Sequence, residues 1–281
     1  MNRPRLPAVA GSFYPSDPDD LVELIDVCFD RSPLGPKGTR SASARLVAGM
    51  VPHAGYVYSG PCAAHFYAAL DRSIQRVILL GVNHWARGHR AALSPWESWQ
   101  TPIGEIAVDP ALNDFLAARV KFLTRDGGAH AQEHSIEVQL PFLPRVLENF
   151  SVVPISLSRL DSDECAELGS AIVAAYEAEV DAGHKTLVLA SSDLSHYLSP
   201  RETEELDHLA LERIIALDAP GLLEVIEENE ITMCGVLPTA VMLHAAKTLG
   251  ATRARLLKHC HSGDVSPMRK VVGYASVAVE L

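Results

Sequence analysis

The stretch ARLVAGMVPHAGYVYSG (44–60) indicates the fold class, because an apolar run of strand length changes abruptly into small, flexible and aromatic residues. Residues 44–51 are expected to form a strand, and the following GPCAAHFYAAL (60–70) a helix with Ser59 as its N-cap. His53 falls in the turn between the two. A histidine at the end of a strand is well placed to serve a binding site at the edge of a sheet.

The rest of the chain repeats this alternation of strand-like and helical segments. Strands are expected at 76–82, 105–108, 151–157, 185–190, 253–260 and 270–280. Helices are expected at 110–118, 133–147, 161–180, 202–217, 220–230 and 235–249. Pro154 predicts that its strand lies at an edge or carries a bulge, and the segment 32–43 is expected to be a flexible loop. The alternation predicts a single α/β/α layered domain over residues 1–281, with a largely parallel or mixed central sheet.

Composition and charge argue against several classes of function. Hydrophobic residues make up 48% of the 281 residues and charged residues 21%, which is typical of a globular chain. The net charge of −11 and the lack of a basic run argue against a nucleic-acid partner, because phosphate contacts need clustered Lys and Arg. No segment resembles a signal peptide or a membrane span, and the five cysteines lack the paired spacing of a disulfide framework. A soluble, cytoplasmic protein without a membrane partner is therefore expected.

Chemically reactive side chains follow several of the expected strands. His53, His84 and Asp193 each come just after one. Because the carboxyl ends of parallel strands meet at one edge of a sheet, these residues are expected to share one crevice. A neutral imidazole there is a ready metal ligand, although a single half-buried histidine more often only hydrogen-bonds a neighbouring loop. Two histidines at successive strand ends favour the metal interpretation.

Cys234 and the SSDLSHY stretch (191–197) supply further candidates. Cys234 precedes an expected helix, and a helix N-terminus favours the thiolate form that binds metal or reacts. Asp193 is suited to orient His196 as a general base. A Ser-His-Asp hydrolase is the weaker interpretation of this stretch, because no G-x-S-x-G turn occurs and triad members usually come from separate segments.

The stretch HAQEH (130–134) matches the H-x-x-E-H zinc motif, in which two histidines one helical turn apart hold the metal. That geometry requires residues 130–134 to be helical. The glycines at 127 and 128 predict instead that the helix begins near Glu133. A zinc hydrolase, which would need His130 as a ligand, is therefore the third hypothesis, and His134 and Glu133 are candidates for lining the site.

A second histidine pair occurs in KHCHSGD (258–264). Alternation along a strand places His259 and His261 on one face and Cys260 on the other. The three side chains are therefore expected to be structural, with Asp264 as a group that supports them.

Eight segments of the chain, taken together, resemble one protein family. They are RLPAVAGSFYP (5–15), VPHAGYVYSG (51–60), LLGVNHW (79–85), EHSIEVQLPFL (133–143), SSDLSHY (191–197), MCGVLPTAVML (233–243), SGDVS (262–266) and VVGYASVAV (271–279). In this order they are similar to the Memo family, whose prokaryotic members are called AmmeMemoRadiSam system protein B. The resemblance covers nearly the whole chain. It implies the α/β architecture of the class III extradiol dioxygenases, which are non-haem iron enzymes that open catechol rings.

The resemblance also implies roles for individual residues. By position, His53, His84 and Cys234 match metal ligands, His196 matches the catalytic histidine of the dioxygenases, and Asp193 lies beside it. An iron or copper ion with a redox role is implied, as are AmmeMemoRadiSam system proteins as partners. Non-haem oxygenases hold Fe(II) with two histidines and one carboxylate, whereas this chain offers the softer, oxidisable sulfur of Cys234. The difference argues against ring cleavage and leaves metal-linked redox chemistry open.

Two functions from different classes follow as hypotheses. The first is a metal-dependent redox or oxygenase-like enzyme that acts on an unidentified small molecule. The second is a non-catalytic module that binds a peptide or a protein in the same crevice, for which aromatic side chains near the site are suitable. Those aromatic residues are Tyr56, Tyr58, Trp85, Trp96 and Trp99.

Overall fold

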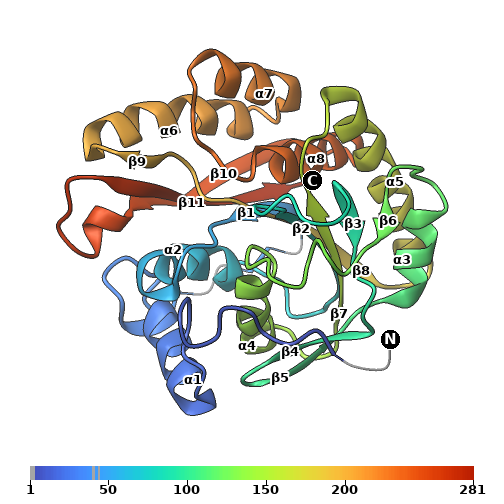
Figure 1. Ribbon diagram of the computed structural model, residues 1–281, viewed down its shortest axis with the longest axis horizontal. Helices are drawn as coiled ribbons and strands as arrows, with labels where there is room; N and C mark the ends of the chain where they lie inside the picture. Colours follow the sequence, from blue (N-terminus) through green and yellow to red (C-terminus); the bar gives the residue numbers. More distant parts are fainter. Residues whose placement is uncertain (1–3, 40–41, 44) are drawn as a thin grey trace.

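The computed structural model describes residues 4–39, 42–43 and 45–281, and a single large sheet forms its centre (Figure 1). The strands of this sheet are β1 (Leu46–Val51), β2 (Ile74–Val82), β3 (Ala91–Leu93), β6 (Thr124–Arg125), β7 (Ser151–Leu157), β8 (Lys185–Ser191), β9 (His196–Leu198), β10 (Arg253–His261) and β11 (Val271–Glu280). Within the described residues they join in the order β10-β11-β1-β8-β2-β7-β3-β6, and β9 pairs with β11. A separate hairpin consists of β4 (Ser98–Thr101) and β5 (Gly104–Ala107).

The middle of the sheet is parallel and its margins are mixed. β1, β8, β2 and β7 are neighbours and run in the same direction. β11 runs antiparallel between β1 and β10, and β3 runs antiparallel to β7. The mixed central sheet expected from the sequence is thus confirmed. Parallel neighbours need crossover connections, which place helices against both faces of the sheet.

The helices form two outer layers. They are α1 (Pro18–Asp26), the π-helical turn η1 (Val27–Arg31), α2 (Tyr56–Ala68), α3 (Pro110–Ala117), the 3-10 helix η2 (Glu137–Phe142), α4 (Leu143–Val146), α5 (Ser162–Asp181), α6 (Pro200–Ile215), α7 (Ala219–Glu228), α8 (Val236–Thr248) and the 3-10 turn η3 (Ser262–Asp264). Figure 1 shows α1, α2 and α4 on one side of the sheet and α5 to α8 on the other. The expected α/β/α layering is confirmed. Among the described residues, none of the helices combines the length and apolarity needed to cross a membrane.

Each face of the sheet has its own hydrophobic core, and β2 shows why. Val77 and Leu79 pack into the core under α1 and α2, whereas Ile78 and Leu80 pack into the core under α5 and α8. All four side chains are fully buried. Successive side chains of a strand point to opposite faces, so a strand buried on both faces reads as a continuous apolar run.

Helix α2 begins earlier than its sequence predicts. Its N-cap is Gly55 rather than Ser59, whose hydroxyl donates to the carbonyl of Ala54 from within the first turn. The N–H of Tyr56 donates to the carbonyl of Phe13, 2.8 Å away. A carbonyl from a distant part of the chain therefore accepts from the first N–H group of the helix, which has no partner within the helix. No local sequence pattern could predict this start.

Proline has different effects in two other elements. Pro154 lies in β7, which is an interior strand, so the expected edge or bulge is wrong. The neighbouring β3 ends at Leu93 opposite Ile155, so the missing N–H of Pro154 falls where the antiparallel ladder stops. The helix expected over 133–147 is broken into η2 and α4, as Pro141 and its neighbour at 144 predict. The loop expected at 32–43 includes residues 40 and 41, and the strand expected at 44–51 begins at residue 44; these three residues lie outside the described residues.

Candidate functional site

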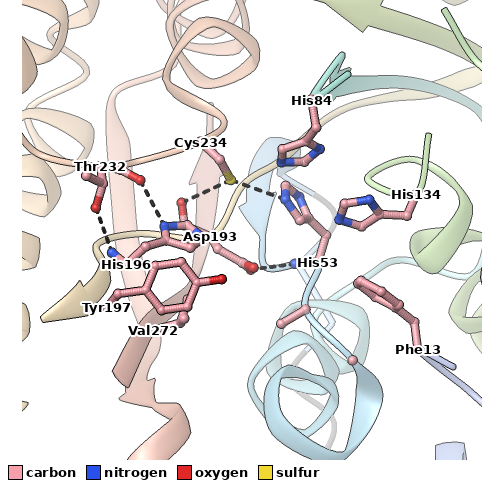
Figure 2. Close-up of a pocket in the computed structure, with 12 residues that line it drawn as sticks. Phe13, His53, His84, His134, Asp193, His196, Tyr197, Thr232, Cys234 and Val272 are labelled. Atoms are coloured by element: carbon pink, nitrogen blue, oxygen red, sulfur yellow. Dashed lines mark hydrogen bonds between the residues drawn. The ribbon is translucent and has the colours of Figure 1, made fainter. Parts of the chain in front are cut away.

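Three neighbouring parallel strands end at the edge of one cleft. β1, β8 and β2 are followed, two residues after their last residue, by His53, Asp193 and His84. The cleft encloses about 480 Å³ and, as Figure 2 shows, these side chains point into it. Its lining consists of Phe13, His53, Ala54, Gly55, His84, His134, Asp193, His196, Tyr197, Thr232, Cys234 and Val272. The crevice expected at the carboxyl ends of the strands is therefore present, and it brings together all the residues predicted as ligands or catalytic groups.

Three of these histidines form a compact cluster. One ring nitrogen from each of His53, His84 and His134 lies within 4.8 Å of the other two. The rings of His84 and His134 are stacked with centroids 4.6 Å apart, and the ring of His53 meets both edge-on at 5.1 and 5.4 Å. A metal ion needs converging lone pairs, so the protonation of each ring decides whether the cluster is able to bind one.

Hydrogen bonds determine which nitrogen of His53 carries the proton. The hydroxyl of Ser191 donates its hydrogen to the carbonyl of Ser135, 2.7 Å away, and accepts from the amide of Gln139 at 2.8 Å. With its only hydrogen used, Ser191 accepts the remaining bond from Nδ1–H of His53 at 3.0 Å. The lone pair of His53 therefore lies on Nε2, the nitrogen that faces Cys234 in the cleft.

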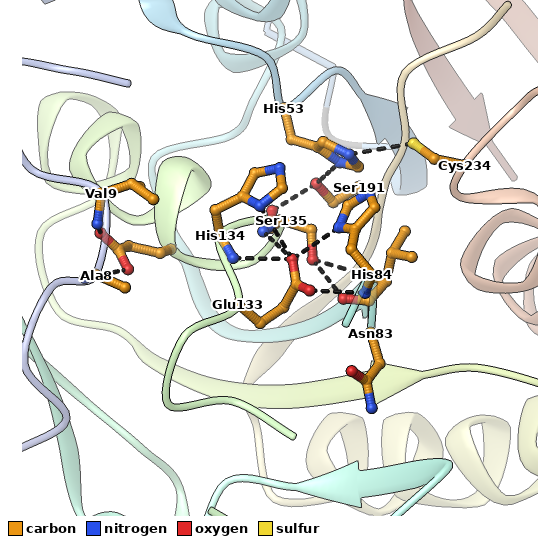
Figure 3. A network of polar contacts seen from close by, with 12 residues as sticks. Ala8, Val9, His53, Asn83, His84, Glu133, His134, Ser135, Ser191 and Cys234 are labelled. Carbon is orange, nitrogen blue, oxygen red and sulfur yellow. Dashed lines mark hydrogen bonds and ion pairs between the residues drawn. The ribbon is translucent and has the colours of Figure 1, made fainter. Parts of the chain in front are cut away.

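The carboxylate of Glu133 orients His84 in the same way (Figure 3). Its Oε1 accepts from Nδ1 of His84 at 2.9 Å and from the backbone N–H groups of His134 and Ser135. Its Oε2 accepts from the backbone N–H of His84 at 2.7 Å. Burial opposes ionisation of Glu133, but the hydrogen bond from His84 and the nearby imidazoles outweigh it, and the pKa falls to about 2. A carboxylate behind a histidine fixes the tautomer and makes the exposed nitrogen a better ligand.

Burial also keeps two of the three rings neutral, those of His53 and His134. Desolvation, followed by the charge of His84, lowers the pKa of His53 to about 3. Desolvation, followed by the charge of His53, lowers the pKa of His134 to about 4. Neutral imidazoles are the form that binds metal, and nitrogen donors of this kind suit iron, copper, nickel and zinc. The three-histidine cluster therefore fits a transition-metal ion.

Cys234 approaches the cluster at His53. Its Sγ lies 3.2 Å from Nε2 of His53 and 3.7 Å from the carbonyl of Asp193. The close approach depends on Gly235, where a Cβ atom would lie 2.6 Å from the carbonyl oxygen of Ser191. Burial, and then the charge of Asp193, raise the pKa of the thiol well above its usual range. Desolvation thus outweighs the expected effect of the α8 N-terminus, and without a metal the sulfur remains a thiol.

His196 is oriented by a residue that the sequence did not single out. Its backbone N–H donates to Oγ1 of Thr232 at 2.7 Å, and its Nδ1 donates to the carbonyl of Thr232 at 2.9 Å. A carbonyl only accepts, so in the neutral ring of His196 the lone pair lies on Nε2. Asp193 has another partner: its Oδ1 accepts from the backbone N–H of His53 at 2.7 Å. The only sequence signal for Thr232 is its position two residues before Cys234.

Comparison with known proteins shows which family the chain belongs to. Residues 5–278 match the family model described as Memo-like protein. The chain belongs to the Memo family. It is 42% identical to a MEMO1 family protein of Methanopyrus kandleri, with 97% of this chain and 98% of the relative aligned. MEMO1 family proteins of Ignicoccus hospitalis and Methanosarcina barkeri are 41% and 40% identical, and at least 98% of each chain is covered.

The zinc motif does not form in this Memo family chain. Residues 130–132 form turns and residues 133–134 are irregular, so this stretch is not a helix. The ring of His130 is fully buried away from the cluster, where its Nε2 donates to the carbonyl of Ala92 at 3.0 Å and the ring lies nearly perpendicular to that of Trp99. Only His134 of the motif lines the cleft, because an irregular segment does not keep the one-turn spacing that the motif requires.

Other predicted groups of this Memo family chain have structural partners. Nε2 of His259 pairs with buried Asp207 at 2.9 Å, and His261 lies beside Asp264. Among the aromatic candidates for ligand binding, Tyr56 and Trp99 are only 1% exposed and belong to the core. The exposed aromatic residues near the expected site are Tyr58, Trp85 and Tyr197.

Proposed function

We propose that the cleft holds an iron or copper ion and supports redox or oxygenase-like chemistry on a small organic substrate. The observation that carries this proposal is the convergence of ring nitrogens from His53, His84 and His134, with His53 and His134 kept neutral by burial. In this proposal Cys234 adds a sulfur donor next to His53 after losing its proton. A bound ion of this kind would supply a redox-active centre.

His196 is proposed to accept a proton from the substrate. Its Nε2 has a free lone pair and it lines the same cleft as the histidine cluster. The positive charge that develops on the ring is stabilised at Nδ1–H by the carbonyl of Thr232, which also holds the ring in place. Phe13 and Val272 add apolar walls, which reduce the access of water to the reacting groups.

Metal content decides between this enzyme and a binding module. Untagged protein purified under nitrogen is analysed by elemental mass spectrometry, with His53→Ala, Cys234→Ser and His196→Ala in parallel. We expect close to one iron or copper per chain in the wild type, almost none in His53→Ala and clearly less in Cys234→Ser. His196→Ala is the matched control, because it removes an imidazole from the cleft without removing a proposed ligand, and should keep its metal.

Two outcomes would contradict the proposal. Full metal content in His53→Ala would show that any metal sits elsewhere. Wild-type protein that stays metal-free after reconstitution with Fe(II) and with Cu(I) would favour the peptide- or protein-binding module on the same scaffold.

A further inference from the structure

The N-terminal arm, residues 5–14, packs against the segment that carries Glu133 and His134. Arg5 is its buried end: its side chain is 1% exposed, and its backbone pairs with β4 through Ser98 and Gln100. A charged side chain buried to this extent must have partners for its donors. Those partners lie in the site segment.

The guanidinium of Arg5 holds two carbonyl groups of that segment. Nε and Nη2 donate to the carbonyl of His130 at 3.2 and 2.8 Å, and Nη2 also donates to the carbonyl of Glu133 at 2.6 Å. Nη1 pairs with the buried carboxylate of Glu137, and Cζ lies over the ring of Trp99, 4.3 Å from its centroid. All three guanidinium nitrogens therefore donate to a partner, and the group also packs against the ring of Trp99.

These bonds fix the peptide group that leads into His134. Its carbonyl, from Glu133, is bound by Arg5. Its N–H, from His134, is bound at 2.8 Å by the carboxylate of Glu133, which also holds His84. With both ends of one peptide plane occupied, the backbone of His134 has a single orientation, and so has the start of its side chain.

The arm also fixes the ring of His134. The Phe13 ring packs against it, with centroids 4.6 Å apart, while the carbonyl of Phe13 is bound by α2. Glu137 holds the middle of the arm by accepting from the N–H groups of Ala8 and Val9 and from the hydroxyl of Tyr14. Figure 3 shows Ala8 and Val9 on the side of the network where His134 lies.

We propose that the N-terminal arm positions His134 for metal binding, with Arg5 setting its backbone and Phe13 its ring. This inference rests on the proposed metal site. Neither arm residue is itself a ligand. Lysine at position 5 would keep the charge beside Glu137 but lacks the planar fork that reaches two carbonyls at once.

The test compares Arg5→Lys and Phe13→Leu with the wild type. Fe(II) affinity is measured by competition with a chromogenic chelator under nitrogen, and the imidazole resonances of 15N-histidine-labelled, metal-free protein are recorded by NMR. Supporting groups around a metal site typically contribute 10- to 100-fold in affinity. We therefore expect a loss of about 10-fold or more for Arg5→Lys and a smaller loss for Phe13→Leu. The resonances of His134 should shift while those of His53 stay in place.

Two controls separate positioning from general destabilisation. Arg145→Lys makes the same chemical change at a partly exposed arginine that pairs with Asp26. Leu112→Ala weakens the core on the other face of the sheet. Both should keep wild-type Fe(II) affinity while they are folded.

Each result has a separate meaning. Unchanged affinity and unchanged His134 resonances in the folded arm variants would overturn the inference. So would an affinity loss without a His134 shift, or an equal loss in Leu112→Ala. If Arg5→Lys does not fold, Phe13→Leu decides by the same criteria. Wild-type protein that binds neither Fe(II) nor Cu(I) refutes the proposed function instead, and the NMR comparison still tests the positioning of His134.

Discussion

Glu133 shows how much of the site depends on one side chain. It is 2% exposed, and its two oxygens accept from the ring of His84 and from three backbone N–H groups. It thereby connects two of the three clustered histidines. A carboxylate suits this position because it only accepts hydrogen bonds, and every partner here is a donor.

Replacement of Glu133 by glutamine should weaken metal binding. The amide keeps the size of the side chain but offers one accepting oxygen, so either Nδ1 of His84 or the backbone loses its partner. We expect Fe(II) affinity to fall by about 10- to 100-fold in Glu133→Gln, as measured by chelator competition. Glu164→Gln, at a partly exposed ion pair with Arg90, is the matched control. Equal affinity in the two variants would mean that Glu133 is not needed behind His84.

Sequence reasoning reached some site residues and missed others for a physical reason. His53, His84 and Asp193 could be predicted because they follow strands whose ends must meet. Thr232 and Gln139 could not be predicted, since a common polar residue has no signature until its partner from a distant part of the chain lies against it, His196 for Thr232 and Ser191 for Gln139. The sequence indicates His134 only as a lining residue, because the motif that would make it a ligand requires a helix over 130–134 and the glycines at 127 and 128 argue against that helix.

Among the helices and strands, an element's start could be predicted where the residues that fix it are close together in the sequence. Asp161 caps α5, close to the start expected from the sequence, and Glu164 bonds back to its N–H in a capping box. The start of α2 and the place of β7 could not be predicted in this way. The first depends on Phe13, some forty residues earlier, and the second on where β3 happens to stop.

The cap of α5 should contribute measurably to stability. Asp161→Ala removes the acceptor for the N–H of Glu164, and we expect the free energy of unfolding to fall by about 1 kcal/mol. Asp163→Ala removes an exposed acidic residue from the same turn without removing the cap, and should cost only a few tenths of a kcal/mol. Urea denaturation measures both. Equal losses would mean that charge near the helix end, and not the cap, is what matters.

For the whole molecule, buried His130 predicts sensitivity to acid. Desolvation lowers its pKa to about 4, whereas an unfolded chain has a value near 6.5. As the pH falls from about 6.5 to 4, the unfolded chain takes up a proton that the folded chain refuses, so stability falls. The loss amounts to about 3 kcal/mol by pH 4.

His130→Gln should remove this part of the pH dependence. Its amide is able to keep the hydrogen bond to the carbonyl of Ala92, but it does not titrate. We measure the free energy of unfolding of chelator-treated wild type and variant by urea denaturation at pH 7, 5.5 and 4. Between pH 7 and pH 4 it should fall by about 3 kcal/mol more in the wild type than in the variant. Parallel pH profiles would show that His130 is accommodated when charged.

The place of β11 has a consequence for how the cleft comes into being. This strand lies between β10 and β1, and it carries Val272, which lines the cleft. A ribosome translates β1 and His53 long before it reaches β11. While β11 is still unmade, the nascent chain has an incomplete cleft wall and an unpaired edge on β1. The wall of the cleft is therefore complete only after that last part of the chain has been synthesised.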